Sequence, residues 1–401
     1  MEGLEQVSKR ASLLLTGLVL VAACVLGLAW LQGMPPQADE HHHARQVRAF
    51  CDGDLRLDRK ITMVPGWHLL AAGVARLTGD CSLLGLRRMN AGLGLLSGLA
   101  FFWASLAVPS RYPGLRSVQY FLCPILFPYQ FLAYTEIGTL LLLLLAAGFL
   151  LRGRSVAAGL VVCASLLLRQ TNVVWLLLVV LYVLLAGDDS RERGGLVRRL
   201  WPCVLGLLGF GLFVVDNGGI ALGDAQAHRA GFYMGNVWFT LLLLALVFLP
   251  HNLFQLWDKR ASLLAWWRLA LAGLVGGWFL AEFGPEHGYN RFPGFARNAL
   301  LVSAENDLSI RAWLLLPLLV GLFALLVTRL QRPALCALYP VALLSLLPIR
   351  LIDQRYSFPF LALFLLFRED DPPPVEVAGV VASALLTAAL TRGLARQAFL
   401  L

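Results

Sequence analysis

The sequence has little charge and almost no lysine. Charged residues make up 14% of the 401 residues and hydrophobic residues 59%, and only three of the 33 basic residues are lysines. A soluble domain has too little interior to hide this much apolar surface. A net charge of +9 without a soluble basic region also argues against binding to nucleic acid. We therefore expect the chain to lie in a membrane, surrounded by lipid.

Sequence motifs for metal binding and N-glycosylation are missing too. The seven cysteines are scattered, with no Cys-x-x-Cys pair or zinc-type His/Cys spacing, and the chain has no Asn-x-Ser/Thr sequon. Three histidines stand in a row at 41–43, but consecutive residues cannot all face one ion. We expect no metal and no cofactor. Cys51 and Cys81 share one predicted loop and can pair if that loop is lumenal, which the sequence leaves open.

Long apolar runs dominate what is present, and the mean hydropathy is +0.72. Because a membrane helix satisfies its own backbone polar groups, such runs indicate helices. We predict an all-α polytopic membrane protein, a single domain over residues 1–401 with about 12 or 13 spans. The expected spans lie at roughly 12–31, 89–108, 117–133, 137–151, 155–168, 173–187, 201–215, 231–249, 262–281, 312–328, 334–349, 356–367 and 376–391.

The distribution of basic residues predicts that the N-terminus is cytosolic. The first apolar run lacks a clear small-x-small cleavage site, so we interpret it as an uncleaved span. Basic residues gather in the turns of the cytosolic side, as the positive-inside rule predicts. They are Arg111, Arg116, Arg152, Arg154, the arginines of 191–199, Lys259, Arg260, Arg329, Arg332 and Arg368. Arg87 and Arg88 depart from this pattern, because they fall on the outer side.

Two long outer loops are expected, at 32–88 and 282–311. Within the first, the segment 65–77 begins with a proline and carries apolar residues at helical spacing. We interpret this segment as a short helix that lies on the membrane surface.

Polar clusters between the apolar runs fall mostly on one side of the membrane. Alternate threading places six of them on the outer side, at 38–43, 134–136, 169–172, 216–228, 287–291 and 352–356, and a seventh, at 191–199, on the other side. A one-sided polar face on a membrane-embedded chain is where chemistry at the membrane surface would be done.

Adjacent carboxylates stand just beyond the first span. Asp39 and Glu40 can supply a general base, although an ordinary solvated acidic pair is the alternative. Glu136 lies between two spans on the same side, either as an interfacial loop residue or as an acceptor for sugar hydroxyls.

Arginines recur in the outer clusters. Arg169 lies in a polar group that joins two apolar runs with almost no loop, a costly position unless it has a partner. Arg291 and Arg355 would place positive charge over the same outer pocket, where guanidinium groups suit phosphate. For Arg355 a local ion pair with Asp353 is the alternative. The glycine-rich stretch 216–228 either converges on a ligand or forms a capped turn.

In this order the motifs resemble the family of eukaryotic α-1,2-glucosyltransferases that add the last glucose to the dolichol-linked oligosaccharide in the endoplasmic reticulum. The matching positions are Asp39-Glu40 with His43, Ile61-Thr62 with Pro65-Gly66, Tyr134-Thr135-Glu136, Arg169-Gln170-Thr171-Asn172 with Trp175, Asn217-Gly218-Gly219 with Gly223-Asp224 and His228, Leu249-Pro250-His251, Asn290-Arg291, and Arg355-Tyr356. They cover most of the chain. The chain looks shorter than typical members around 187–200, and 282–300 matches loosely.

The resemblance implies a GT-C-like bundle in the membrane of the endoplasmic reticulum with a lumenal active face. The donor would be dolichyl phosphate glucose and the acceptor the diglucosylated lipid-linked oligosaccharide, with inversion at the transferred sugar. Asp39 is the implied general base, with Glu40 as the alternative, and Arg169, Arg291 or Arg355 would hold the donor phosphate. The implied substrate-binding set is His43, Tyr134, Glu136, Gln170, Asn172, Asn217, Asp224, His228, Asn290 and Tyr356.

Other functions stay open at this point. A GT-C transferase that uses another polyprenyl-phosphate sugar, such as mannose or arabinose, would have nearly the same fold. A lipid flippase or solute transporter would place ionisable groups near mid-membrane and often show inverted repeats. Charges at span ends and the lack of an internal repeat favour an enzyme. A non-catalytic membrane subunit is the third possibility, and the sequence leaves the oligomeric state open.

Overall fold

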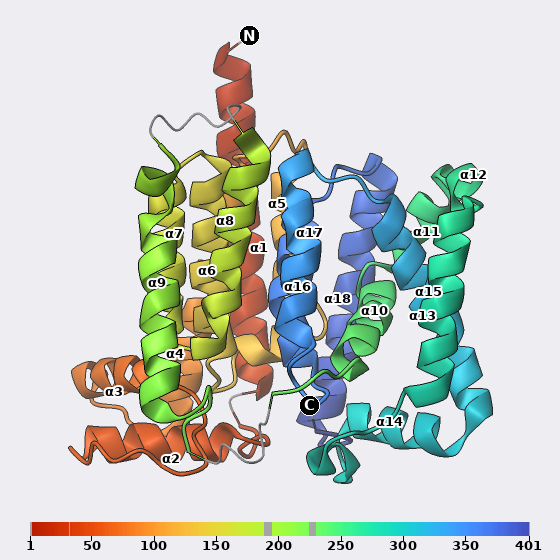
Figure 1. Cartoon of the computed structure of the whole chain (residues 1–401). Coiled ribbons are helices and arrows are strands. Elements are labelled where there is room, and N and C mark those ends of the chain that lie inside the picture. Colours follow the sequence, from red (N-terminus) through yellow and green to blue (C-terminus); the bar gives the residue numbers. More distant parts are fainter. Residues whose placement is uncertain (1, 32, 188–194, 224–229, 401) are drawn as a thin grey trace.

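The computed structural model describes residues 2–31, 33–187, 195–223 and 230–400, and its regular elements within these ranges are helices (Figure 1). The predicted all-α class is confirmed for this part of the chain. The α-helices are α1 (Glu2–Leu31), α2 (Glu40–Cys51), α3 (Gly66–Thr78), α4 (Leu83–Ser105), α5 (Pro113–Phe121), α6 (Glu136–Leu151), α7 (Ser155–Leu166), α8 (Val174–Ala186), α9 (Leu196–Asn217), α10 (Gly235–Val247), α11 (Leu249–Asp258), α12 (Arg260–Leu263), α13 (Trp266–Glu282), α14 (Ala296–Asn306), α15 (Leu308–Val327), α16 (Leu338–Leu346), α17 (Phe358–Phe367) and α18 (Pro373–Ala395).

Fewer helices in the described residues are long enough to cross a bilayer than the sequence predicts. Four helices, within α1, α9, α15 and α18, are long and apolar enough to cross a bilayer. The bent pairs α3–α4 and α10–α11 raise the number to six if each pair counts as one span. Every expected range overlaps a helix, but several of these helices are short. The range 117–133 is wrong as a single span, because α5 ends at Phe121 and a separate 3-10 helix, η1 (Phe127–Gln130), follows.

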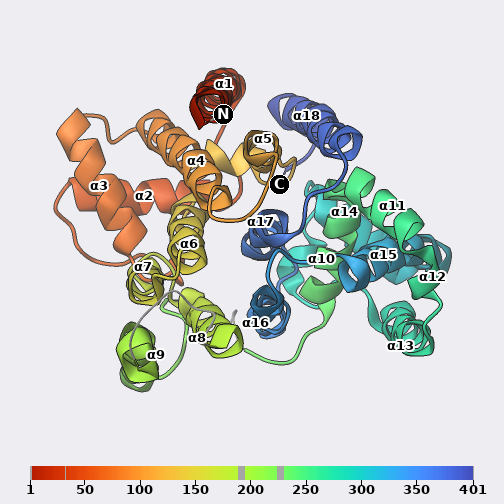
Figure 2. The same ribbon diagram turned by 90° about the horizontal axis from the view of Figure 1, so that it is seen from above.

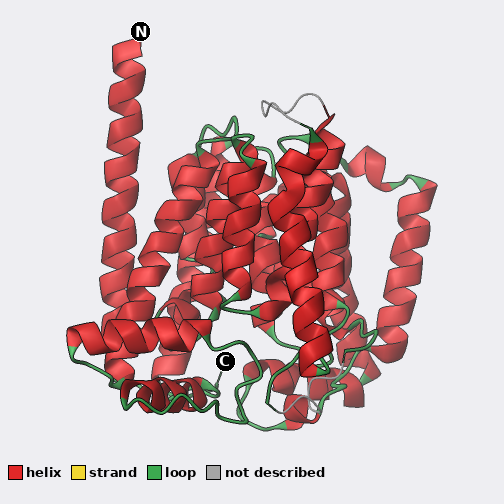
Figure 3. Cartoon of the chain, turned by 60° about the vertical axis from the view of Figure 1, so that its left-hand side comes forward, coloured by secondary structure: helices red, strands yellow, loops and turns green. Residues whose placement is uncertain are grey.

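One end of the bundle is covered by helices that lie across it. Helices α2, α3 and α14 run over the end at which α1 finishes, and we call this end the outer face (Figures 1 and 3). The predicted short helix at 65–77 is confirmed as α3, which meets α4 at 110°. A disulfide joins Cys51 at the end of α2 to Cys81 before α4. At Gly66 an added Cβ would lie 2.0 Å from the Leu167 carbonyl oxygen, so α3 can approach the end of α7 only with glycine there.

Seen along the bundle axis, two groups of helices flank a central one (Figure 2). Helices α4, α6, α7 and α9 pack in sequence on one side, and α10, α13 and α15 pack together on the other. Between them lies α17, whose residues are all buried except Pro359, which is partly buried. A helix that is apolar all round needs such a central position. Arg355 precedes α17 at the outer face, and Arg368 follows it at the opposite end.

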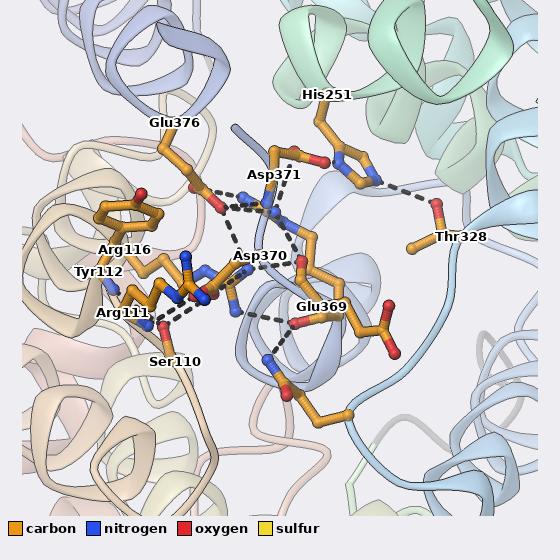
Figure 4. Close-up of polar contacts among 12 residues, drawn as sticks. Ser110, Arg111, Tyr112, Arg116, His251, Thr328, Glu369, Asp370, Asp371 and Glu376 are labelled. Carbon is orange, nitrogen blue, oxygen red and sulfur yellow. Dashed lines mark hydrogen bonds and ion pairs between the residues drawn. The ribbon is translucent and has the colours of Figure 1, made fainter. Parts of the chain in front are cut away.

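The opposite end of α17 carries a buried cluster of charges (Figure 4). Arg368 donates to Glu376 at 2.7 Å and to Asp371 at 3.0 Å, and Arg116 donates to Glu376 at 3.1 Å. His251 on α11 contacts Asp371 through Nδ1 at 2.6 Å. Both guanidinium groups and the Glu376 carboxylate are almost completely buried. The cluster therefore ties α5, α11 and α18 to the end of α17.

We expect Glu376→Gln to destabilise the protein strongly. The substitution leaves two buried guanidinium groups without their shared carboxylate, a loss of roughly 3–5 kcal/mol for a buried ion pair broken at one partner. Thermal unfolding in detergent would measure the loss. The neighbouring Glu369 is exposed, and Glu369→Gln is the matched control with little expected effect. Equal melting temperatures for the two variants would contradict the structural role of the cluster.

Candidate functional site

The carboxylate of Asp39 stands at the outer face between α1 and α2. Its side chain is 55% exposed, and its Oδ2 accepts a hydrogen bond from Arg355 Nη2 at 3.2 Å. The Asp39 backbone N–H donates to the Tyr134 hydroxyl at 3.0 Å. Ala38, just before it, has a positive φ of 43°, which residues other than glycine rarely adopt. Backbone strain and a fixed N–H thus hold an accessible carboxylate in one direction.

Arg355 joins segments that are distant in the sequence. Its Nη2 lies 3.0 Å from Asp353 Oδ2 as well as 3.2 Å from Asp39, and its Nη1 lies 3.8 Å from Glu136 Oε1. The guanidinium also lies over the Tyr134 ring, 5.2 Å from its centroid. The side chain is 12% exposed. This position makes Arg355 the shared partner of carboxylates from three outer clusters.

Two further arginines extend this network at its ends. Arg169 Nη1 donates to Glu136 Oε1 at 2.5 Å, and its side chain is 18% exposed. Arg297 on α14 lies 3.3 Å from Asp353 Oδ2. The network therefore runs from α14 to the segment that joins α7 and α8, with Arg355 in the middle.

A pocket lies beside Arg169 and Arg355, and its empty space is about 480 Å³ with the adjoining open solvent included. It is formed at the outer ends of α6, α8, α16 and α17. Its lining residues are Glu136, Thr139, Leu140, Arg169, Thr171, Asn172, Trp175, Ser345, Ile349, Arg355, Tyr356, Phe358 and Pro359. The pocket combines two guanidinium groups with apolar and aromatic walls, which suits an anionic headgroup attached to a lipid chain.

The charges around Arg355 lower the pKa values of Asp39 and Asp353. Partial desolvation opposes ionisation of Asp39, but the neighbouring groups that favour the carboxylate, led by Arg355, together hold its pKa below its ordinary value. Burial opposes ionisation of Asp353 in the same way, yet Arg297 and Arg355 lower its pKa to about 2. Burial lowers the pKa of His43 to about 3, so this imidazole is neutral at neutral pH and shares a 2.9 Å hydrogen bond with His68.

Glu40 differs sharply from its neighbour Asp39. It is fully buried, and its two oxygens accept from Arg87 at 2.9 and 2.7 Å. The backbone N–H groups of Gln37 and Ala133 also donate to it, each at 2.9 Å. This pairing accounts for Arg87 on the outer side: the arginine neutralises a buried carboxylate there. The structure thus uses Glu40 to hold the first outer loop against α4.

Three predicted substrate-binding amides hold backbone groups together. Gln170 accepts from Val64 N–H at 3.1 Å and donates to the carbonyls of Thr62 and Ile220, both at 2.9 Å. Asn290 exchanges hydrogen bonds with the backbone of Ile352 at 2.8 and 3.0 Å. Asn217 is exposed and donates to carbonyls of its own turn. These amides shape the outer face and lie outside the pocket lining.

The remaining predicted residues divide between the network and other places. Tyr356 and Asn172 line the pocket, and Tyr134 lies under Arg355. Arg291 is not brought to this network, because its guanidinium, 54% exposed, pairs with Glu305 at 2.6 Å. Asp224 and His228 lie outside the described residues. The glycine-rich stretch before them packs on the first outer loop, where an added Cβ at Gly223 (φ 59°) would lie 2.4 Å from the Arg59 carbonyl oxygen.

Sequence reasoning missed three contributors to this face. Arg297 lies in α14, within a range expected to be a loop, and no motif marks it. Arg87 was visible only as an exception to the positive-inside pattern, and that exception was its signal. Thr139 lies one turn into an apolar run, where a lone threonine attracts no attention.

We expect the adjacent carboxylates to respond differently to removal of charge. Glu40→Gln leaves Arg87 buried without a counter-charge and should cost roughly 3–5 kcal/mol of stability. Asp39→Asn changes an exposed side chain and should leave the melting temperature within a few degrees of the parent protein. Thermal unfolding in detergent measures both. A stable Glu40→Gln variant would show that the buried pair does not hold the loop.

Comparison with known proteins adds independent information. The model of the DIE2/ALG10 family matches this chain at residues 34–195 and 188–368. The protein named Dol-P-Glc:Glc(2)Man(9)GlcNAc(2)-PP-Dol alpha-1,2-glucosyltransferase in Mus musculus is 25% identical over 306 residues, 62% of this chain and 65% of the mouse protein. The Rattus norvegicus protein of the same name is 24% identical over 330 residues, which are 67% of this chain and 70% of the rat protein. The matched region thus spans about two-thirds of the length of these curated relatives.

Solved structures align more distantly. The archaeal oligosaccharyltransferase AglB from Archaeoglobus fulgidus, in complex with an inhibitory peptide and a dolichol-phosphate, has a TM-score of 0.45 and 13% identity, covering 95% of this chain and 56% of that one. An Archaeoglobus fulgidus oligosaccharyltransferase in complex with zinc and sulfate has a TM-score of 0.36 and 14% identity, covering 91% and 53%.

Proposed function

Since the chain belongs to the DIE2/ALG10 family, we propose that it transfers glucose from dolichyl phosphate glucose to the diglucosylated dolichol-linked oligosaccharide. The product would carry the terminal α-1,2-linked glucose. The names of the mouse and rat relatives support this reaction. The observation that carries it is Arg355, which contacts the exposed Asp39 carboxylate and also lines the pocket with Arg169.

The proposed reaction divides the site into a base and a phosphate clamp. Asp39 takes the proton from the acceptor hydroxyl, whose oxygen attacks C1 of the donor glucose. The bond between C1 and the phosphate oxygen breaks, and dolichyl phosphate leaves with the electron pair. Attack from the face opposite the leaving group inverts the configuration at C1. Arg169 and Arg355 stabilise the negative charge that develops on the phosphate.

The location of the pocket suits a donor that stays in the membrane. Leu140, Ile349, Phe358 and Pro359 supply apolar wall beside the two guanidinium groups. A lipid chain can therefore remain against apolar side chains while its phosphate reaches the arginines. We propose that the protein lies in the membrane of the endoplasmic reticulum with the Asp39 face toward the lumen.

Arg355 also links donor binding to the strength of the base. Without donor, Arg355 holds the pKa of Asp39 low, which makes the carboxylate a weak base. A donor phosphate that takes over the Arg355 Nη2 hydrogen bond removes this partner, so the pKa of Asp39 rises toward its ordinary value. The mechanism thus proposes that the donor binds before the acceptor is deprotonated.

We expect Asp39→Asn to abolish glucose transfer with normal protein yield. An amide cannot accept the proton, and loss of a general base costs about 10²–10⁴-fold in rate. Mass spectrometry of the lipid-linked oligosaccharide, after incubation with dolichyl phosphate glucose, detects the added hexose.

A matched control is Asp52→Asn, an exposed carboxylate in the same loop, which should transfer at the parent rate. Normal turnover by Asp39→Asn would overturn the base assignment. Transfer only from dolichyl phosphate mannose would favour the GT-C alternative with another sugar.

We expect Arg169→Lys to weaken use of the donor. Lysine keeps a positive charge near Glu136 but lacks the planar fork that binds phosphate. About one or two charge-assisted hydrogen bonds are lost, so the KM for the donor should rise roughly 10-fold or more. Steady-state kinetics with varied dolichyl phosphate glucose measures this effect. Arg291→Lys is the control, because Arg291 pairs with Glu305 outside the pocket. A raised donor KM in Arg291→Lys alone would move the phosphate site to that loop.

A further inference from the structure

Two buried oxygen atoms on α6 lack hydrogen-bond partners among the residues that the structure describes. They are Oε2 of Glu136 and Oγ1 of Thr139. Both residues are 4% exposed, and both line the pocket beside Arg169 and Arg355. At a spacing of three residues they lie on the same helix face, one turn apart. Buried polar groups of this kind are almost always paired in a working protein.

The chemistry of the Glu136 carboxylate determines which kind of ligand group can form a hydrogen bond with Oε2. Its other oxygen, Oε1, accepts a hydrogen bond from Arg169 at 2.5 Å, so the carboxylate group is held in place by this partner. A carboxylate oxygen accepts hydrogen bonds and repels anions. The donor phosphate therefore belongs at the guanidinium groups, and a hydroxyl group belongs at Oε2. A pocket that holds both needs a ligand with an anion and a polyol side by side, as in a sugar phosphate.

The wall near these oxygens also suits a sugar. Trp175, at the outer end of α8, lines the same pocket, and α6 and α8 lie near each other in both views (Figures 1 and 2). An indole ring offers a flat apolar surface with a large contact area. Hexoses combine polar hydroxyl edges with an apolar face of C–H groups, which such a ring can cover.

We propose that Glu136 and Thr139 hold hydroxyl groups of the transferred hexose, with Trp175 beside the ring, and that Glu136 determines which hexose is accepted. The inference rests on the proposed function for the identity of the donor. A hexose without the matching hydroxyl group would leave this carboxylate oxygen buried and unpaired. Such a hexose would therefore bind more weakly than the correct one.

Binding and turnover test this subsite separately. Equilibrium binding compares dolichyl phosphate glucose with dolichyl phosphate, which lacks the sugar. The intact protein should bind the glucosyl lipid at least about 10-fold more tightly, the equivalent of one good hydrogen bond to a charged group. Glu136→Gln and Thr139→Val should each reduce this ratio, and Thr139→Val should leave the affinity for dolichyl phosphate unchanged. Equal affinity of the intact protein for the two lipids would overturn the subsite.

Donors that lack single hydroxyl groups show whether Glu136 touches the sugar or acts through Arg169. If Oε2 binds one hydroxyl, the donor without that hydroxyl should be about equally poor for the intact protein and for Glu136→Gln, because both have lost the same contact. A role only through Arg169 would weaken all donors by the same factor and would overturn the proposal. Thr78→Val is the control, because this exposed hydroxyl on α3 lies outside the pocket lining and donates to the Val74 carbonyl.

The outcomes for the reaction and for the subsite are distinct. Sugar-dependent binding that depends on Glu136, without any transfer, would remove the proposed reaction and keep the hexose subsite. Transfer by the intact protein, with the same donor selectivity in Glu136→Gln and Thr139→Val, would keep the reaction and remove the subsite.

Discussion

The outer face depends on a nearly buried guanidinium group. Arg355 is 12% exposed, so its charge needs compensation that water cannot supply. Asp39, Glu136 and Asp353 provide it from the α1–α2 segment, α6 and the segment before α17. Segments far apart in the sequence are therefore held at one point by a single cation, and this point borders the pocket. The fold of the outer face and the position of the candidate base have the same physical origin.

Charge balance explains which member of this network can respond to a ligand. Three arginines (Arg169, Arg297 and Arg355) face three carboxylates (Asp39, Glu136 and Asp353). The proposed donor phosphate would add negative charge, so one carboxylate would have to give up its share of a guanidinium group. Asp353 is fully buried between two arginines and Glu136 is almost fully buried, whereas Asp39 is 55% exposed with one arginine contact. Asp39 is the carboxylate that water can stabilise after release, which fits the role of a base that is strengthened when the donor binds.

The sequence predicts the one-sided arrangement of polar clusters because topology follows from apolar runs and basic turns, and the described contacts between these clusters agree with it. It cannot predict whether a polar side chain meets a ligand or the backbone. Gln170 and Glu136 both lie next to hydrocarbon runs, yet the amide ties three backbone groups and the carboxylate lines the pocket. Asp39 and Glu40 are adjacent in the chain, but one is exposed and the other buried, because helix α2 begins between them. Such differences depend on tertiary packing, which a single sequence does not encode in any local pattern.

The length of α17 explains why both charged clusters are so completely paired. Ten helical residues span about 15 Å, half of the roughly 30 Å hydrocarbon core. A helix of this length cannot place its two ends at the two surfaces of a bilayer of ordinary thickness. Arg355 and Arg368 at these ends therefore need protein partners rather than water, and both have them.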